Sequence, residues 1–153
     1  MFKRILCPID FDDHSLNALR MAVGLAQREQ AKVYLLHVVP PTDPIVISSP
    51  FAAHRAENYA RAELQKIAEN ELTGVDHEIL LRFGSPASEI LAAEADTKAE
   101  LIVVATHGRT GVSHLLIGSV AEKLVRESPC PILTVHMKAT HQGTERETTP
   151  PAD

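Results

Sequence analysis

Short apolar runs alternate along the chain with longer segments that have the spacing of amphipathic helices, and this alternation continues to about residue 137. The apolar runs are the expected strands, at residues 3–9, 32–39, 77–83, 101–105 and 131–137. Such an alternation predicts a parallel sheet with crossover helices. The run at 101–105 is apolar throughout, which is typical of a central strand buried on both faces.

The first two helical segments have recognisable starts and ends. Asp12 or Asp13 can cap the first helix. Its expected apolar face is Leu16, Leu19, Val23 and Ala26. The second helix has an expected apolar face of Ala60, Leu64, Ile67 and Ala68. We expect Gly74 to end the second helix, and residues 40–50, rich in Pro and Ser, to form an exposed loop.

Two further helices are indicated by capping signals. Ser85 is placed to cap a third helix, with Pro86 at its first position. Ser119 and Glu122 have the spacing of a capping box, which predicts that Ser119 caps a fourth helix. This last helix is expected to end by residues 127–129.

The final strand has the features of a sheet edge. Pro129 and Pro131 have the same parity, so both missing N–H groups lie on one side of this strand. The apolar residues 132–135 would then need to be covered or paired with another chain. We expect one domain over residues 1–138 and a polar, disordered tail over residues 139–153.

Composition narrows the class of protein. The chain has 153 residues, and its 15 Lys+Arg against 20 Asp+Glu give a formal charge of −5. With no basic run, this balance argues against a general nucleic-acid binder. The apolar runs are far shorter than the roughly 18 residues of a membrane span, so we expect a cytoplasmic protein. Cys7 and Cys130 are interpreted as buried, reduced thiols.

Common catalytic motifs are absent from the sequence. It contains no G-x-x-x-x-G-K-[ST] phosphate loop, no G-x-G-x-x-G, no G-x-S-x-G, no H-E-x-x-H and no C-x-x-C. The usual nucleotide-binding and hydrolase templates are therefore excluded.

A glycine-rich segment after the fourth strand is the best candidate site. Gly108 and Gly118 would let the backbone adopt a positive φ and approach a ligand closely. A helix that starts at Ser119 and Val120 presents backbone N–H groups and the positive end of its dipole. Together these features predict an anion site, most naturally for phosphate. A glycine pair before a helix can equally do no more than shape a loop.

Asp10 is a second candidate because it directly follows the first strand. Ligands of open parallel sheets bind beyond the carboxyl ends of the strands, where the strand order reverses. If the first and fourth strands are neighbours, Asp10 lies beside Ala105 and Gly108 and can accept hydrogen bonds from ribose hydroxyls. A cap for the first helix is the alternative role of Asp10.

With these motifs in view, the chain resembles the universal stress protein family. The matching segments are residues 4–11 (RILCPIDF), 36–38 (LHV), 84–86 (GSP), 106–111 (THGRTG) and 118–123 (GSVAEK). They occur in the family order and span residues 2–138. The resemblance implies a Rossmann-like three-layer α/β sandwich with a five-stranded parallel sheet in the order 3-2-1-4-5. It also implies a homodimer that pairs through the C-terminal edge strand.

The resemblance also implies a nucleotide site. ATP-binding members carry G-x2-G-x9-G-[ST], and here Ala105 replaces the first glycine while Gly108, Gly118 and Ser119 match. The implied adenosine pocket is Pro8, Ile9, Asp10 and Val38. The implied sugar and phosphate wall is Val104, Ala105, His107 and Gly108. The implied phosphate-binding residues are Gly118, Ser119 and Val120. Ile9 stands where relatives often have Thr or Ser, so one hydrogen bond is lost.

Three basic side chains need separate interpretation. Arg109 can offset triphosphate charge or can simply be solvated. His107 can reach the sugar or phosphates, but no acid or nucleophile is evidently paired with it, so it is not expected to be a catalytic base. His37 sits inside an apolar run and is interpreted as a core histidine.

The sequence thus predicts an ATP-binding stress-response protein whose nucleotide, bound with Mg²⁺, is a regulatory ligand. No catalytic residue and no metal site of the protein's own are predicted, and a regulatory protein partner is compatible with this function. Two alternatives remain open, a slow ATPase of the same fold and an interaction module that binds no nucleotide.

Overall fold

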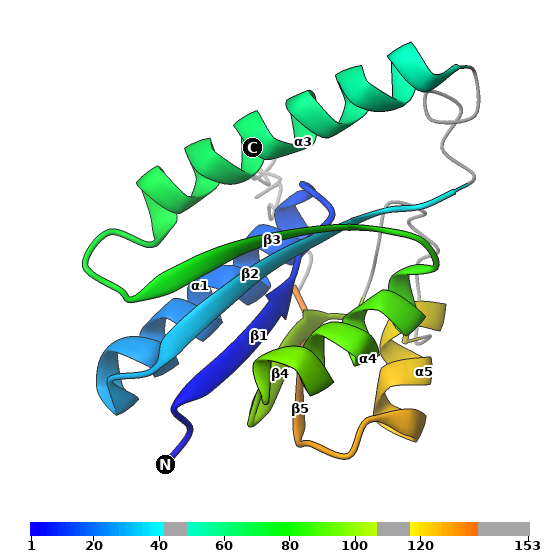
Figure 1. Ribbon diagram of the computed structural model, residues 1–153. Helices are drawn as coiled ribbons and strands as arrows, with labels where there is room; N and C mark the ends of the chain where they lie inside the picture. Colours follow the sequence, from blue (N-terminus) through cyan, green and yellow to red (C-terminus); the bar gives the residue numbers. More distant parts are fainter. Residues whose placement is uncertain (42–48, 107–116, 138–153) are drawn as a thin grey trace, which may run out of the picture.

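The computed structural model describes residues 1–41, 49–106 and 117–137. In this part of the chain, five parallel strands form one sheet in the order β3-β2-β1-β4-β5, as predicted (Figure 1). The strands are β1 (Arg4–Pro8), β2 (Lys32–Val39), β3 (His77–Phe83), β4 (Leu101–Ala105) and β5 (Ile132–Val135).

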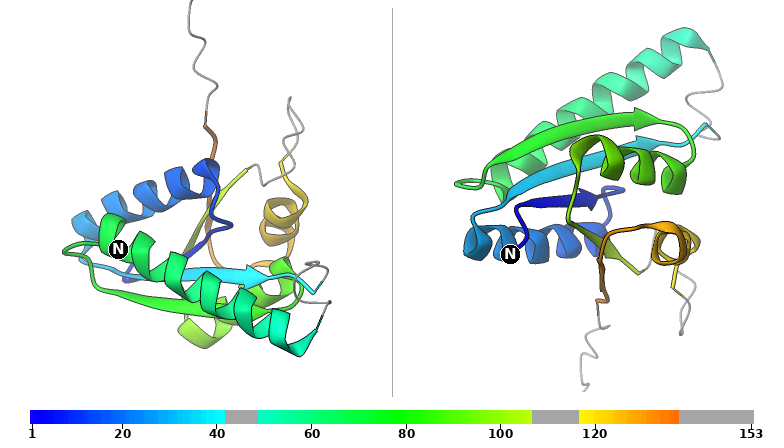
Figure 2. Two further views of the ribbon diagram at one scale, coloured as in Figure 1. Left: turned by 90° about the horizontal axis from the view of Figure 1, so that it is seen from above. Right: turned by 60° about the horizontal axis from the view of Figure 1, so that its bottom comes forward.

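Helices cover both faces of the sheet, which confirms the three-layer sandwich (Figures 1 and 2). The helices of the first face are α1 (Asp13–Glu29) and α3 (Pro50–Glu71). Those of the second face are α4 (Pro86–Thr97) and α5 (Ser119–Glu127). None of the helices in the described ranges is both long and apolar enough to span a membrane.

Side chains of the central strands alternate between the two faces. Ile5 and Leu35 pack toward α1 and α3. Leu6 and Leu36 pack toward α4 and α5. All four are buried, which gives the sheet an apolar core on each side. The same alternation decides which side of the functional site each residue reaches.

Asp12 is the cap of α1, since its Oδ1 accepts the backbone N–H of Ser15 at 2.7 Å. The buried face of the helix is Ser15, Ala18, Leu19, Ala22 and Ala26. Leu16 and Val23, predicted for this face, are only half-buried. Apart from Leu19, the side chains buried against the sheet are small, and Leu16 and Val23 flank this buried line.

The second predicted helix, α3, begins inside the segment predicted to be a loop. Ser49 caps it by accepting the N–H of Ala52 at 3.1 Å, and Pro50 is its first residue. The predicted apolar face is mostly correct, although Ile67 is only half-buried. Gly74 does not end the helix, which stops at Glu71; Gly74 lies in the following turn with a φ of 76°. The rest of the predicted loop, residues 42–48, lies outside the described residues.

The predicted capping box at the start of α5 is wrong. Gly118 is the cap, with extended backbone, and Ser119 is already the first helical residue. Gly118 donates its N–H to the carbonyl of Thr106 at 2.6 Å, which fixes the backbone just before Ser119. The helix therefore begins one residue earlier than expected. Ser85 does occupy the cap of α4, with Pro86 at the first position, but its side chain makes no capping hydrogen bond.

The final strand, β5, is shorter than the predicted 131–137 and lies at the edge of the sheet, as expected. Cys7 is fully buried in β1, as predicted. Cys130 is only half-buried, contrary to expectation, because it lies in the turn that precedes β5 rather than inside a strand.

Candidate functional site

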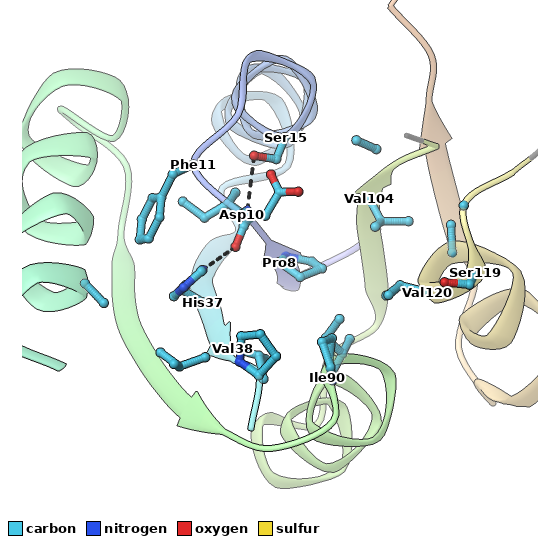
Figure 3. Close-up of a pocket in the computed structure, with 18 of the residues that line it drawn as sticks. Pro8, Asp10, Phe11, Ser15, His37, Val38, Ile90, Val104, Ser119 and Val120 are labelled. Carbon is cyan, nitrogen blue, oxygen red and sulfur yellow. Dashed lines mark hydrogen bonds between the residues drawn. The ribbon is translucent and has the colours of Figure 1, made fainter. Parts of the chain in front are cut away.

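A cavity of about 780 Å³ opens at the carboxyl ends of the strands (Figure 3). It is lined by all the predicted site residues that the structure describes, namely Pro8, Ile9, Asp10, Val38, Val104, Ala105, Gly118, Ser119 and Val120. The other predicted site residues, His107, Gly108 and Arg109, lie outside the described residues. Four segments distant in sequence therefore meet at one cavity.

The cavity exists because β1 and β4 separate toward their carboxyl ends. Register pairs join these two strands only at Ile5 with Leu101 and at Leu6 with Ile102. By contrast, the pairing of β1 with β2 continues to Pro8. The chain leaves β1 toward the face of α1, and the chain that follows β4 returns on the opposite face as α5. Open parallel sheets bind ligands at such a point.

Asp10 lies at the centre of the site, between α1 and the separated strand ends (Figure 3). Its Oδ1 accepts the backbone N–H of Asp12 at 3.2 Å, and its own N–H donates to the Ser15 hydroxyl at 3.2 Å. Because Asp12 caps α1, the Asp10 carboxylate is not the helix cap. Burial, with a smaller contribution from the Asp12 carboxyl, raises the pKa of Asp10 above its ordinary value.

Phe11 and His37 form an aromatic pair beside Asp10. Their ring centroids are 4.2 Å apart with an angle of 33° between the planes. His37 Nδ1 lies 2.8 Å from the carbonyl oxygen of Ile9, so Nδ1 carries the proton of this hydrogen bond. Phe11 has a φ of 68°, which bulky residues rarely adopt. His37 is therefore hydrogen-bonded, as a core histidine would be, but it also lines the cavity.

The amino end of α5 borders the opposite side of the cavity. Among the described residues, no side chain caps this helix, so its first-turn N–H groups have no side-chain acceptor there. Gly118 has a φ of −56°, so the expectation that it needs a positive φ is wrong. Glycine suits this position because it places no side chain beside the cavity, so a ligand can approach the backbone closely.

The remaining walls are mainly apolar. Pro8, Val38, Val104 and Val120 surround the space between α4 and α5, and Ile90 of α4 closes its floor in Figure 3. Apolar walls with a few convergent polar groups are typical of small-molecule sites.

Several lining residues were missed by sequence reasoning. Phe11 directly follows Asp10, and His37 precedes Val38, so their places beside predicted residues were the available signals. Arg55 and Tyr59 belong to the part of α3 upstream of the predicted apolar face. No local pattern distinguishes them from other exposed helix residues.

The described residues of this cavity offer few ligands for a metal ion. In the described ranges, no group of three or more His, Cys, Asp or Glu side chains is arranged to hold a metal ion. Asp10 is the single carboxylate among the described lining residues. A divalent cation would therefore need ligands from a bound molecule as well.

The comparisons with known proteins agree with this fold. A sequence model of the universal stress protein family matches residues 1–136. A universal stress protein from Thermus aquaticus is 39% identical over 137 residues, which cover 88% of this chain and 99% of the relative. The solved structure of MJ0577 from Methanocaldococcus jannaschii has a TM-score of 0.80 and 27% identity, covering 90% of this chain and 98% of that one.

A universal stress protein solved in complex with cAMP is also similar. Its TM-score is 0.65 at 26% identity, and the match covers 88% of this chain and 97% of that protein. The family match spans most of the sequence, and the strand order agrees with it. The chain therefore belongs to the universal stress protein family.

Proposed function

We propose that this protein binds ATP in the cavity at the carboxyl ends of β1 and β4, and that the nucleotide is a regulatory ligand in a stress response. The main observation behind this proposal is that all the predicted site residues within the described ranges line one cavity. The similar protein solved with cAMP supports an adenine nucleotide as the ligand class.

Each part of the nucleotide has a matching part of the site. The apolar walls at Pro8, Ile9 and Val38 suit the adenine ring, and Val104 and Ala105 border the sugar. The Asp10 carboxylate is a hydrogen-bond acceptor for the ribose hydroxyls. The amino end of α5 at Ser119 and Val120 offers N–H groups and a positive dipole to the phosphates, and Gly118, whose own N–H is bonded to Thr106, leaves room for their approach. In the same proposal, His107, Gly108 and Arg109 complete the phosphate wall.

Mg²⁺ would accompany ATP rather than occupy a protein site of its own. Mg²⁺ commonly keeps several waters and binds through one or two carboxylates together with substrate phosphates. Asp10 is the carboxylate that fits this role, and the remaining ligands would be phosphate oxygens and water. The ion would neutralise phosphate charge in a protein with a formal charge of −5.

ATP binding would regulate the protein through the thermodynamic linkage between ligand binding and conformation. A ligand that binds one state stabilises that state, so ATP would favour the conformation and assembly that hold it. We further propose a homodimer through β5, whose described register pairs are with β4 and which lies at the sheet edge. The proposal includes a cytoplasmic location, a domain over residues 1–138 and a polar tail over residues 139–153.

Calorimetry with ATP and Mg²⁺ tests the proposal. We expect a dissociation constant between about 1 μM and 1 mM for the wild-type protein. Gly118→Val should abolish the heat of ATP binding, because the added valine side chain would occupy the edge of the cavity. The backbone should tolerate the substitution, since a φ of −56° is ordinary for an L residue. Equal heats from both proteins, or none from either, would contradict the proposal. Phosphate release above a buffer blank would favour an enzyme instead of a regulatory binder.

A further inference from the structure

The cavity has a second part, which is lined by residues other than those assigned to ATP. Val38 and Val104 pack on the face of α4 and α5. His37, one position away from Val38, is directed to the face of α1 and α3, yet it lines the same cavity. The cavity therefore continues around the carboxyl edge of the sheet. We call its part lined by Phe11, His37, Ala52, Arg55, Ala56 and Tyr59 the α3 lobe.

The walls of the α3 lobe are aromatic on one side and small on the other. Phe11 and His37, with centroids 4.2 Å apart, lie on the side of the cavity nearer α3 in Figure 3. Across from them, α3 contributes Ala52 and Ala56, which share a helix face at a spacing of four residues. Alanine leaves room where larger side chains would fill the space, so a flat ring can lie against the aromatic pair.

Charge in the α3 lobe is supplied by Arg55. Among the described lining residues it is the single Lys or Arg. Within the described ranges, Arg55 takes part in none of the ion pairs, whereas Arg61 on the same helix is paired with Glu57. The carboxylate of Asp10 lies on the other side of Phe11, toward the ATP residues (Figure 3). An anionic group in the lobe is thus favoured at Arg55 and disfavoured near Asp10.

We propose that the α3 lobe is a second ligand site that takes a planar aromatic ring bearing a carboxylate. The ring lies against Phe11 and His37, and the carboxylate is hydrogen-bonded by the Arg55 guanidinium. Tyr59, which is 64% exposed, borders the entrance. The proposal does not depend on ATP binding, because none of the six residues of the lobe is among those assigned to ATP.

Naphthoate and its neutral counterpart naphthamide are suitable probes, because they share a planar ring and differ in charge. In calorimetry with the full chain, we expect naphthoate to bind about tenfold or more tightly than naphthamide, given the strength of hydrogen bonds between charged partners. Equal affinities, or no binding of naphthoate at millimolar concentration, would overturn the proposal.

Substitutions on α3 locate the probe. Arg55→Gln should remove the preference for naphthoate, and Ala56→Leu should weaken both probes by filling the lobe. Arg61→Gln is the matched control, because Arg61 is absent from the cavity lining and should leave both affinities unchanged. Arg55 is exposed, so its variant keeps the test decisive even if Ala56→Leu fails to fold. If Arg55→Gln still bound naphthoate more tightly than naphthamide by the wild-type factor, the proposal would be overturned.

Two further measurements separate this site from the ATP site. Gly118→Val should bind naphthoate normally, since Gly118 directly precedes Ser119, which lies on the opposite side of the cavity from Phe11 and His37 in Figure 3. Saturating ATP should not displace the probe if ATP binds as proposed. Loss of naphthoate binding in Gly118→Val would place the probe in the nucleotide part and overturn the proposal. Failure of ATP to bind, with naphthoate still sensitive to Arg55→Gln, would contradict only the proposed function.

Discussion

Glu94 on α4 accepts the backbone N–H of Cys130 through Oε1 at 3.2 Å, and thereby ties a helix to the turn that precedes β5. Its Oε2 accepts the hydroxyl of Ser128 in the same turn at 2.9 Å. Glu94 is only 4% exposed, and a buried carboxylate is tolerated where hydrogen-bond donors surround it. The edge strand is thus held by a side chain from outside the sheet as well as by its ladder with β4.

Removing this carboxylate should destabilise the protein. Glu94→Ala removes the acceptor of the Ser128 hydroxyl and one of the two acceptors of the Cys130 N–H, the other being the Ser128 hydroxyl oxygen at 3.2 Å, and we expect a loss of about 1–3 kcal/mol in the free energy of unfolding. Glu94→Gln keeps an amide oxygen for that N–H and should lose less. Urea denaturation measures both variants, with Glu127→Ala, an exposed position at the end of α5, as a control that should change stability by less than about 0.5 kcal/mol. Equal, small losses for Glu94→Ala and Glu94→Gln would contradict the role given to this contact.

Asp10 should lower the stability of the ligand-free protein at neutral pH. Its pKa is raised in the folded state, chiefly by burial, so the protonated form is favoured by folding. The stability from this group is present below its ordinary pKa of 3.8 and is lost as the pH rises through the raised native value. Asp10→Asn should therefore be more stable than wild type at pH 7, and the difference should close in acid.

The measurement is urea denaturation over a pH series, combined with ATP calorimetry at pH 7. We expect Asp10→Asn to bind ATP about tenfold or more weakly, because a charged acceptor for the ribose is lost. Asp13→Asn is the matched control: Asp13 is exposed in the first turn of α1, and its loss should cost about 0.3–1 kcal/mol through the helix dipole. A destabilised Asp10→Asn at pH 7 would refute the assignment.

Two glycines should respond to alanine with opposite signs. Gly84, before α4, has a φ of 142°, and an added Cβ would lie 3.0 Å from Glu89 Oε1. Gly84→Ala should lose about 1–3 kcal/mol, because L residues avoid this backbone conformation. Gly24, inside α1, has nothing within 4 Å of a built Cβ, so Gly24→Ala should gain about 0.5–1 kcal/mol. Thermal unfolding of both variants checks the signs, and a stabilised Gly84→Ala would show that this turn can relax.

The two thiols should differ in reactivity. Cys7 is fully buried, and burial raises its pKa to about 12. Cys130 is half-buried, and its pKa is also raised, mainly by burial. Because the thiolate is the reactive form, native protein should consume one equivalent of Ellman's reagent slowly, whereas urea-unfolded protein should consume two. Cys130→Ser should abolish the native reaction. Rapid labelling of both thiols in native protein would show that β1 opens readily.

Local pattern was sufficient to identify the five strands, and β2, β3 and β4 have the predicted bounds. A strand needs only a short run of apolar residues, which is visible in the sequence itself. The strand order came from resemblance to the family rather than from periodicity. Helix boundaries were less accurate, because the cap of α5 depends on a hydrogen bond between Gly118 and Thr106, whose partners are twelve residues apart.

The sequence by itself determined the alternation of strands and helices, the edge position of β5, and the predicted site residues that, within the described ranges, meet at one cavity. Only the tertiary structure decided that Asp12 rather than Asp10 caps α1, and that His37 and Arg55 reach the same cavity from separate elements. The physical reason is that apolar spacing reports which side of an element is buried. The width of the opening between β1 and β4, and the helix that borders it, depend on packing between segments far apart in the chain.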